Sequence, residues 1–224
     1  MSRLGRPRLH LRTIGSTNAR ARELAEAGAP HGTAVTAGEQ TAGRGRQGRT
    51  WQTPAGVAIA ASLVLREFDD LLPLRAGLAV ADVAGPSALV KWPNDVWVDG
   101  KKVAGILVEA RGDWAVLGIG VNVALDPSDL PADVAQIAGT LGRDESEVDA
   151  TLTELLGRLE QRLVEEKATT LTQLRERDAL LGRAVQWDGG RGEGAGIDDG
   201  GGLIVRLDDG TTTTLNAGEV TLTT

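Results

Sequence analysis

Residues 96–122 read VWVDGKKVAGILVEARGDWAVLGIGVN, and this stretch decides the fold. It alternates apolar runs with two turn dipeptides, Asp99-Gly100 and Gly112-Asp113. A turn dipeptide between two apolar runs is a strong signal for a β-hairpin. The pattern therefore predicts three consecutive antiparallel strands at the centre of a sheet, over residues 96–98, 103–110 and 114–123.

The flanking sequence adds strands and helices around this centre. Residues 57–66 are almost continuously apolar, which is typical of a strand buried on both faces. Asp144 and Glu147 have the spacing of a capping box at the start of the best helical pattern. We expect an α+β fold in which helices pack on a central mixed or antiparallel sheet. The predicted outer strands cover residues 8–14, 33–39 and 57–66, and the predicted helices cover 19–27, 73–84, 145–166 and 169–180.

The character of the sequence changes after Gly182. Short stretches of strand character are separated there by glycine clusters. This pattern predicts a small, barrel-like β domain over residues 182–224, following a catalytic domain over residues 1–181. The expected strands of the small domain are 184–187, 203–207, 211–215 and 219–222.

The composition excludes several kinds of site. The 224 residues include no cysteine and two histidines, which excludes disulfides and thiolate chemistry and disfavours a histidine zinc site. The net charge of −7 argues against nucleic-acid binding by the whole surface. No apolar run reaches the ~20 residues of a membrane span, and the N-terminus lacks the apolar core of a signal peptide. We expect a soluble, cytoplasmic protein.

The most informative loop is residues 43–51, GRGRQGRTW. Its glycines match G-x-G-x-x-G, but a dinucleotide-binding fingerprint must open a helix, and Pro54 and Gly56 follow here. Three guanidiniums this close repel one another and need a polyanion on which to converge, and arginine pairs well with phosphate oxygens. The loop alone fits a nucleotide site and an RNA-binding Arg-Gly turn equally well.

A second candidate motif is residues 91–95, KWPND. The apolar run 88–90 predicts a buried strand that would hold Lys91 rigidly at its end, with Asn94 and Asp95 close enough to orient the amine. The alternative is an ordinary turn, because Pro-Asn-Asp is a strong turn string. Taken alone, the motif favours the turn.

Together these motifs resemble the biotin protein ligase family. The arginine loop and residues 91–95 carry the closest likeness. Four supporting motifs occur in family order, so the resemblance spans about residues 16–122: Ser16-Thr17-Asn18, Glu39-Gln40, residues 102–109 (KVAGILVE) and residues 118–122 (GIGVN).

The resemblance implies a fold and a reaction. The fold would be the class II synthetase-like biotin ligase domain followed by a small SH3-like β-barrel. The enzyme would use ATP and Mg²⁺ to convert biotin to biotinyl-5′-AMP and pyrophosphate, and would then transfer biotin to a lysine of a biotin carboxyl carrier protein. Some family members also carry a DNA-binding domain. The stretch before Ser16 is too short for one, so we expect a ligase without DNA binding or repressor activity.

The resemblance also implies roles for individual residues. The catalytic candidates are Lys91, which would contact the biotin carboxylate and the α-phosphate, Arg46 and Asp95, the last also a candidate Mg²⁺ contact. Glycines in a strand would let its backbone lie against the ligand. The biotin-binding candidates are Ser16, Thr17, Asn18, Gln40, Arg44, Gly45, Arg46, Lys91, Gly118 and Gly120. The nucleotide-binding candidates are Arg44, Arg46, Arg49, Trp51, Asn94 and Lys102.

Tryptophan supplies five of the six aromatic residues. Trp51 and Trp92 belong to the motifs above, and a flat apolar ring is a suitable lid for biotin or adenine. Trp97, Trp114 and Trp187 are predicted to be core residues. Glu109 is interpreted as part of the polar face of its strand.

Three other interpretations stay open. A lipoate ligase of the same fold is the nearest, although the arginine-rich loop before Trp51 favours biotin. A nucleic-acid-binding protein is disfavoured by the acidic balance and by the lack of Tyr and Phe platforms. A non-catalytic biotin sensor is disfavoured by Lys91. Strand edges of the central sheet could also support a homodimer.

Overall fold

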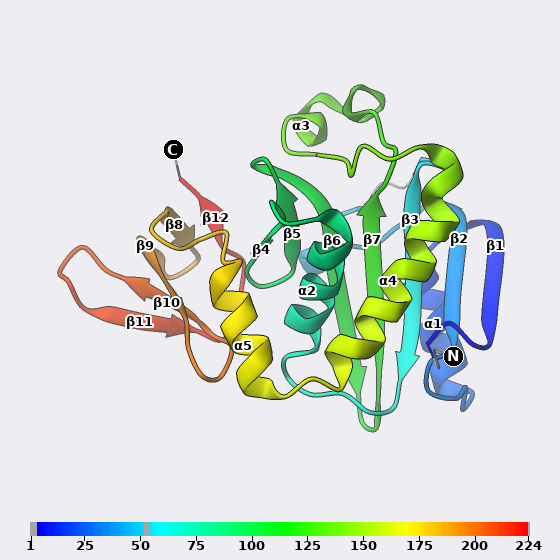
Figure 1. Cartoon of the computed structure of the whole chain (residues 1–224), viewed down its shortest axis with the longest axis horizontal. Coiled ribbons are helices and arrows are strands. Elements are labelled where there is room, and N and C mark those ends of the chain that lie inside the picture. Colours follow the sequence, from blue (N-terminus) through cyan, green and yellow to red (C-terminus); the bar gives the residue numbers. More distant parts are fainter. Residues whose placement is uncertain (1–3, 52–53, 224) are drawn as a thin grey trace.

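A computed structural model describes residues 4–51 and 54–223 of the chain. It contains a seven-stranded sheet in the order β1-β2-β3-β7-β6-β5-β4 (Figure 1). Within this sheet β1 and β2 run parallel, and the other neighbouring pairs run antiparallel, which confirms the predicted mixed sheet. The strands are β1 Arg8–Ile14, β2 Ala34–Gln40, β3 Ala58–Leu65, β4 Leu89–Lys91, β5 Asp95–Val98, β6 Lys101–Arg111 and β7 Trp114–Asn122.

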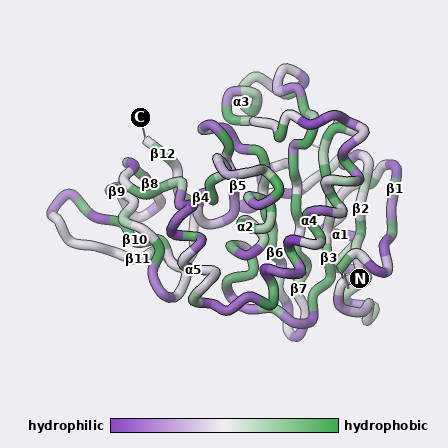
Figure 2. The backbone as a smooth tube through the Cα atoms, in the orientation of Figure 1, coloured by the Kyte–Doolittle hydropathy of each residue, from purple (hydrophilic) through white to green (hydrophobic). Residues whose placement is uncertain are grey.

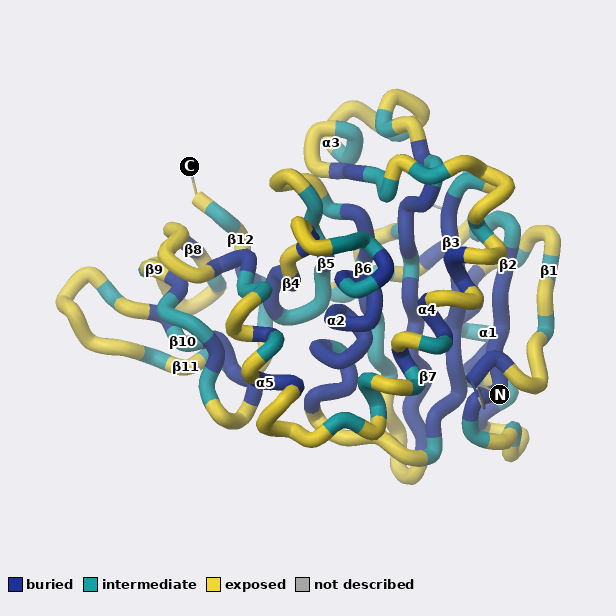
Figure 3. Tube along the Cα trace, viewed as in Figure 1, coloured by how far each residue is buried: buried dark blue, intermediate teal, exposed yellow. Residues whose placement is uncertain are grey.

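Helices cover both faces of this sheet. α2 (Leu72–Ala84) and α4 (Val148–Leu163) pack on one face, and α1 (Thr17–Glu26) packs on the other (Figure 1). Successive side chains of a strand point to opposite faces, so a strand between two helical layers must be apolar throughout. β3 is buried along its whole length, and β3 and β7 run as apolar, buried tubes through the middle of the molecule (Figures 2 and 3).

The predicted helices differ from the observed ones mainly at their ends. Asp144 and Glu147 form the predicted capping box, but the first turn, Glu145–Glu147, is a 3₁₀ turn, and α4 follows it. α5 (Lys167–Glu176) ends well before residue 180, because the backbone of Arg177 and Ala179 pairs instead with Val90 of β4. Within the described ranges, 4–51 and 54–223, we find no helix with both the length and the apolar character needed to cross a bilayer.

A second, smaller sheet follows α5, with strand order β11-β10-β9-β8-β12 and antiparallel pairing. The sequence missed β9, because its glycines at 190, 192, 194 and 196 predict turns. A Cβ on Gly194 would overlap the Leu180 carbonyl, so that glycine allows close backbone approach. The strands are β8 Ala184–Trp187, β9 Gly190–Ile197, β10 Leu203–Arg206, β11 Thr212–Leu215 and β12 Thr221–Leu222.

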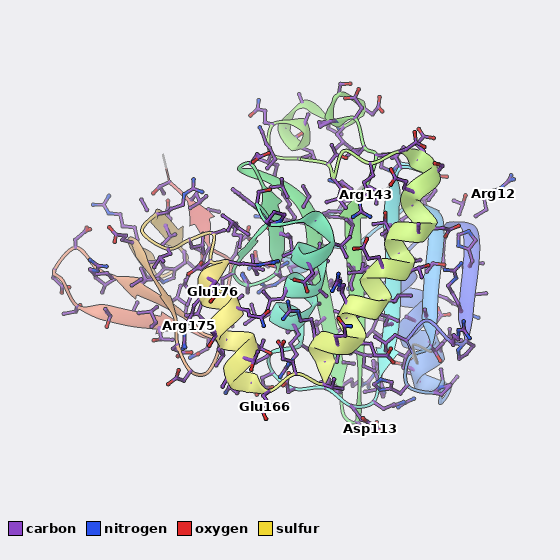
Figure 4. The ribbon with its side chains drawn as sticks, in the orientation of Figure 1. Arg12, Asp113, Arg143, Glu166, Arg175 and Glu176 are labelled. Carbon is purple, nitrogen blue, oxygen red and sulfur yellow. The ribbon has the colours of Figure 1, made fainter. Side chains whose placement is uncertain are left out.

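The small sheet is tied firmly to the rest of the chain. Val185, Val205 and Val220 share one apolar core with Val90 and Trp92. Arg175 of α5 also donates to the Ile197 carbonyl at 2.8 Å and pairs with Asp199 (Figure 4). A division into domains at residues 181 and 182 therefore stays a prediction.

A lobe with no predicted element connects β7 to α4. It contains a 3₁₀ turn, Pro127–Asp129, and one short helix, α3 (Ala132–Ala135). In Figure 1 the lobe lies above the upper ends of the strands of the large sheet. Arg143 anchors the end of the lobe by donating to the Val83 carbonyl at 2.8 Å and to Glu154 at 3.1 Å (Figure 4).

Asp178, between α5 and β8, gives a pH-dependent test of this junction. Burial raises the pKa of its carboxyl above the ordinary value of 3.8, although Oδ1 accepts the Leu180 N–H at 2.8 Å. A raised native pKa disfavours the ionised form, so stability falls as pH rises from the ordinary pKa through the raised one. Asp178→Asn keeps an acceptor oxygen and removes the charge. We expect a higher Tm at pH 7 and a gain that shrinks below pH 4, measured by thermal unfolding. A variant less stable than the parent at pH 7 would contradict this account.

Candidate active site

A cavity of about 870 Å³ opens on the face of the large sheet that α1 covers in part. On β7, Val116 packs with α1, and the next residues on that face are Gly118 and Gly120. The sheet therefore has a hollow floor just beyond the N-terminus of α1. The walls come from the arginine loop (residues 43–51), from residues 130–138 of the lobe and from residues 219–222.

Each of the two glycines of the floor lies against a neighbouring side chain. A Cβ on Gly118 would overlap Oδ1 of Asn18, and a Cβ on Gly120 would overlap the indole of Trp51. The space above each glycine is thus filled by a neighbouring side chain. Both glycines line the cavity, and a side chain at either position would displace Asn18 or Trp51, so their contact with a ligand stays a prediction.

Ser16, Thr17 and Asn18 serve two purposes. Ser16 is the N-cap of α1 and accepts the Ala19 N–H, and all three residues are buried and line the cavity. The Thr17 N–H donates to Oε1 of Gln40 at 2.8 Å. The helix-cap interpretation and the binding interpretation of this motif are therefore compatible, and the polar end of the cavity contains all four predicted residues.

Sequence reasoning missed Glu109. The residue accepts from Nδ2 of Asn18 at 2.9 Å and pairs with Arg44 at 3.0 Å, so its interpretation as a plain polar strand face is wrong. The available signal was a single carboxylate inside the otherwise apolar run 103–110. An isolated charge in a strand next to a binding motif needs a partner.

The arginine loop closes on itself, and its arginines reach acceptors elsewhere in the chain. The backbone N–H of Trp51 donates to the Gly43 carbonyl at 2.9 Å, and the backbones of Arg44 and Thr50 pair as an isolated antiparallel β-bridge. Arg46 donates to Oδ1 of Asn94 at 3.1 Å and to the Gly218 carbonyl at 2.9 Å. Arg44, Gly45, Arg46 and Arg49 all line the cavity, as predicted from the sequence. That the loop is mobile without ligand stays a prediction.

Residues 218–220 were not predicted to belong to the site. The Gly218 carbonyl accepts from Arg46, Glu219 forms an ion pair with Arg49, and the Val220 carbonyl accepts from Lys91 at 2.6 Å. Three consecutive residues before β12 thus supply acceptors for the cationic side chains of Arg46, Arg49 and Lys91. No local pattern identifies them, because the partners are far apart in the sequence.

The two lysines at the site are in different environments. Lys91 is 8% exposed, its amine is committed to the Val220 carbonyl, and burial lowers its pKa against the opposing effect of Asp95. Nζ of Lys102 lies 2.7 Å from Oδ1 of Asp95 as an ion pair without good hydrogen-bond direction. The same amine is 5.5 Å from the centre of the Trp51 ring. Lys102 is therefore the more accessible cation.

Two of the tryptophans exchange their predicted places. Trp51 lines the cavity as predicted. Trp92 is buried and donates its indole N–H to the Gly201 carbonyl at 3.0 Å, so it faces the small sheet and is no lid. Trp97, predicted as a core residue, lines the cavity with its ring 5.7 Å from Nζ of Lys91. Trp97 lies on β5, a strand too short to read from periodicity, and Trp92 lies in the turn between β4 and β5.

The described residues include no group of three or more histidine, aspartate or glutamate side chains arranged to hold a metal ion. Two carboxylates of the cavity pair with its cations, Asp95 with Lys102 and Glu219 with Arg49. Asn94 spans the Arg46 guanidinium and the Ile106 carbonyl. The cavity thus has a polar end, a cationic middle and an apolar wall that includes Leu130, Val134 and Ile137.

Comparison with known proteins gives one family and several relatives. The model of the biotin/lipoate A/B protein ligase family matches residues 11–126. The chain is 35% identical over 228 residues to the biotin–acetyl-CoA-carboxylase ligase of Mycobacterium tuberculosis, with 92% of this chain and 85% of the relative covered. It is 37% identical over 158 residues to the bifunctional ligase/repressor BirA of Bacillus subtilis, with 64% of this chain and 49% of that relative covered, so the match spans about half of the relative's length.

The fold also matches a solved structure. The biotin protein ligase from Aquifex aeolicus in complex with biotin and ATP superposes with a TM-score of 0.82 at 30% identity, covering 97% of this chain and 99% of the other.

Proposed function

Because the chain belongs to the biotin/lipoate A/B protein ligase family, we propose that it is a biotin protein ligase that works in two steps. In the first step the carboxylate of biotin attacks the α-phosphorus of ATP, which forms biotinyl-5′-AMP and releases pyrophosphate. In the second, a lysine amine of an acceptor protein attacks the acyl carbon and releases AMP. The observation that carries this proposal is one cavity with a polar end, a cationic middle and an apolar wall.

The polar end suits the ureido head of biotin. Thr17 and Asn18 offer oxygen and nitrogen atoms within a buried pocket, and Ser16 and Gln40 line the same end. A small bicyclic ligand with two N–H donors and one carbonyl acceptor needs such a compact set of partners. The carboxylate arm of the ligand would then extend toward the cations.

For the first step, the geometry favours Lys102 over Lys91 as the group that meets the reacting carboxylate and α-phosphate. Fixed positive charge aimed at the oxygens where negative charge gathers lowers the barrier to phosphoryl and adenylyl transfer. Lys102 presents a paired, partly accessible amine at the cavity, whereas the amine of Lys91 is already bonded to the Val220 carbonyl. Lys91 would hold residues 218–220 in place and add to the positive potential.

The arginines and Trp51 suit the nucleotide. Arg49 can exchange its present acceptor, Glu219, for phosphate oxygens, to which guanidinium binds bidentately. Arg46 can offer its remaining N–H groups to the same oxygens while it keeps its bonds to Asn94 and Gly218. Arg44 and Gly45 would cover the junction with biotin. The adenine ring would lie between Trp51 and the apolar wall of residues 130–138, with Asn94 orienting Arg46.

Mg²⁺ fits this site as an ion that arrives with ATP. Mg²⁺ is bound in many nucleotide sites through one or two carboxylates together with substrate phosphates. Asp95 is the carboxylate beside Lys102 that would reach such an ion. When bound, the ion would neutralise phosphate charge.

The acceptor we propose is a biotin carboxyl carrier protein of an acyl-CoA carboxylase, as the names of the relatives suggest. A cytoplasmic location and a homodimer stay predictions.

Gly120→Ala tests the position of the nucleotide. The added methyl would overlap the Trp51 indole, so the ring must shift out of its place. Losing one stacking surface for a base is expected to raise the KM for ATP about tenfold while the KM for biotin changes less than about twofold. The matched control is Gly157→Ala, at a helical position with nothing near the new atom. If Trp51 is displaced and the KM for ATP is unchanged, adenine does not stack on Trp51.

Pyrophosphate release tests the function itself. The purified chain with ATP should release pyrophosphate when biotin is added and not when lipoate is added, and Lys91→Ala and Lys102→Ala should be compared in the same assay. Release with lipoate alone would make it a lipoate ligase. Biotin binding without release in the parent would make it a sensor. Retention of RNA without biotin binding would favour the nucleic-acid interpretation.

A further inference from the structure

A second cavity, of about 480 Å³, lies between the C-terminal ends of α2, α4 and α5 (Figure 1). Among the described residues it shares none of its walls with the active-site cavity. Its charged walls consist of three arginines and two carboxylates: Arg158 and Arg162 on α4, Arg177 after α5, Asp82 on α2 and Glu165 after α4. The cavity therefore has an excess of positive charge, in a chain whose net charge is −7.

Arg162 meets both carboxylates of this second cavity. Its Nε and Nη2 donate to the two oxygens of Asp82 at 2.9 and 2.8 Å. Its Nη1 donates to the two oxygens of Glu165 at 3.0 and 3.1 Å. Because bidentate pairing of this kind orients a guanidinium and satisfies it, Arg162 is a fixed part of the wall. The excess positive charge then lies on the other two arginines.

Arg158 and Arg177 are the two available arginines of this cavity. Arg158 is exposed, and no described residue forms an ion pair or a hydrogen bond with its guanidinium. Nη1 of Arg177 lies 3.3 Å from Oδ1 of Asp82 without forming a hydrogen bond, and this side chain is 27% exposed. Asp82 gives its well-directed bonds to Arg162, which leaves Arg177 without a full partner.

An alternative role for the two available arginines is to cap the carbonyl ends of the neighbouring helices, where cations are favourable. Those carbonyls already have other donors. At the end of α2, Arg143 donates to the Val83 carbonyl at 2.8 Å. At the end of α4, Arg75 donates to the Arg162 carbonyl at 2.7 Å and to the Glu165 carbonyl at 2.9 Å. The two available arginines are therefore not needed as caps for these carbonyls.

We propose that this second cavity binds a tetrahedral oxyanion of the phosphate class through Arg158 and Arg177. Guanidinium forks match the spacing of phosphate oxygens. Because the two arginines come from different elements, an anion with oxygens in more than one plane can meet both of them more completely than a planar carboxylate can. The amide of Gln161, which also lines the cavity, offers a further donor. The same chemistry fits free phosphate and the phosphoryl group of a larger molecule, and it does not depend on the proposed function.

The test is a titration of the isotope-labelled full chain with sodium phosphate, followed by NMR, with sodium chloride at the same ionic strength as the reference. The backbone amides of Gly85 and Gln173, which line the second cavity, are expected to shift and to saturate. Phosphate can also reach the arginine loop, so the amide of Gly45 reports that site separately. Arg158→Ala removes one charge-assisted fork from an exposed position. It is expected to weaken the binding reported by Gly85 and Gln173 about tenfold and to leave the titration of Gly45 unchanged.

Two further variants separate the loss of a specific donor from a general change in charge. Arg158→Lys keeps the positive charge but loses the fork, so an intermediate affinity is expected. Arg183→Ala removes an exposed arginine outside this cavity and should keep the affinity of the parent. Arg158 lies within α4, where alanine is a good helix former, and thermal unfolding of each variant confirms that it is folded.

A parallel titration with glycerol 3-phosphate distinguishes the two sources of the oxyanion. Tighter binding of inorganic phosphate assigns the cavity to the free ion, and tighter binding of the monoester assigns it to the phosphoryl group of a larger molecule. The proposal is overturned if Gly85 and Gln173 shift no more with phosphate than with chloride, if their shifts rise without saturation, or if Arg158→Ala keeps the affinity of the parent. Because neither biotin nor ATP is present, such a failure leaves the proposed function untouched.

Discussion

Lys102→Ala is expected to slow the formation of biotinyl-5′-AMP by about 10²–10³-fold. Its amine is the more accessible of the two lysine amines at the cavity, beside Asp95 and over Trp51, so its loss leaves the gathering phosphate charge with more distant partners. Lys91→Ala is expected to have a smaller effect of about tenfold, because the buried amine acts on the site mainly through the Val220 carbonyl.

Single-turnover pyrophosphate release, with saturating biotin and ATP, measures both variants. Lys101→Ala is the matched control, since it removes an exposed amine one residue away that contacts the Gln136 carbonyl at the outer surface. The opposite order, with Lys91→Ala the more damaging variant, would return the central role to Lys91, as the sequence predicts.

Arg46→Gly is expected to form biotinyl-5′-AMP but to release it into solution about 10- to 100-fold faster than the parent. The guanidinium joins the loop to Asn94 and to the Gly218 carbonyl, and each such charge-assisted hydrogen bond contributes about 1.5–3 kcal/mol. Partial exposure reduces that value here. Without these bonds the loop no longer shields a mixed anhydride that water attacks.

Free adenylate in the filtrate of a stopped reaction measures the leak. Arg12→Gly, which removes an exposed arginine that points into solvent from β1, is the control and should retain the intermediate as the parent does (Figure 4). Retention by Arg46→Gly equal to that of the parent would mean that other contacts hold the loop closed.

The elements that could be predicted from the sequence are those with a local signal. The hairpins at Asp99-Gly100 and Gly112-Asp113 and the apolar run of β3 each carry their own pattern, and all are present. β9 was missed because a strand made of alternating glycines looks like a turn until the neighbouring backbones are placed. The predicted helix 169–180 extends too far, because residues 177–179 pair with β4 and helical periodicity does not show such pairing.

The site follows the same rule. The predicted residues at 16–18, 40, 44–46, 91 and 118–120 do line one cavity, because each sits in a motif with its own spacing. Glu109 and residues 218–220 were missed because their importance lies in what they touch across strands and sheets. Trp92 was predicted at the cavity and Trp97 in the core, and the structure shows the reverse. The sequence places each residue but does not show to which side its ring points.

The acceptors at residues 218–220 also bear on the order in which the molecule becomes competent during synthesis. The contact between Arg46 and Gly218 joins residues 172 positions apart, so ribosomes complete the arginine loop long before Gly218 exists. Contacts of such separation form late, after local hairpins and helices. A nascent chain can therefore carry every motif of the site and still lack the means to keep a reactive acyl phosphate enclosed. Under the proposed function, the site can retain biotinyl-5′-AMP only after the small sheet has docked.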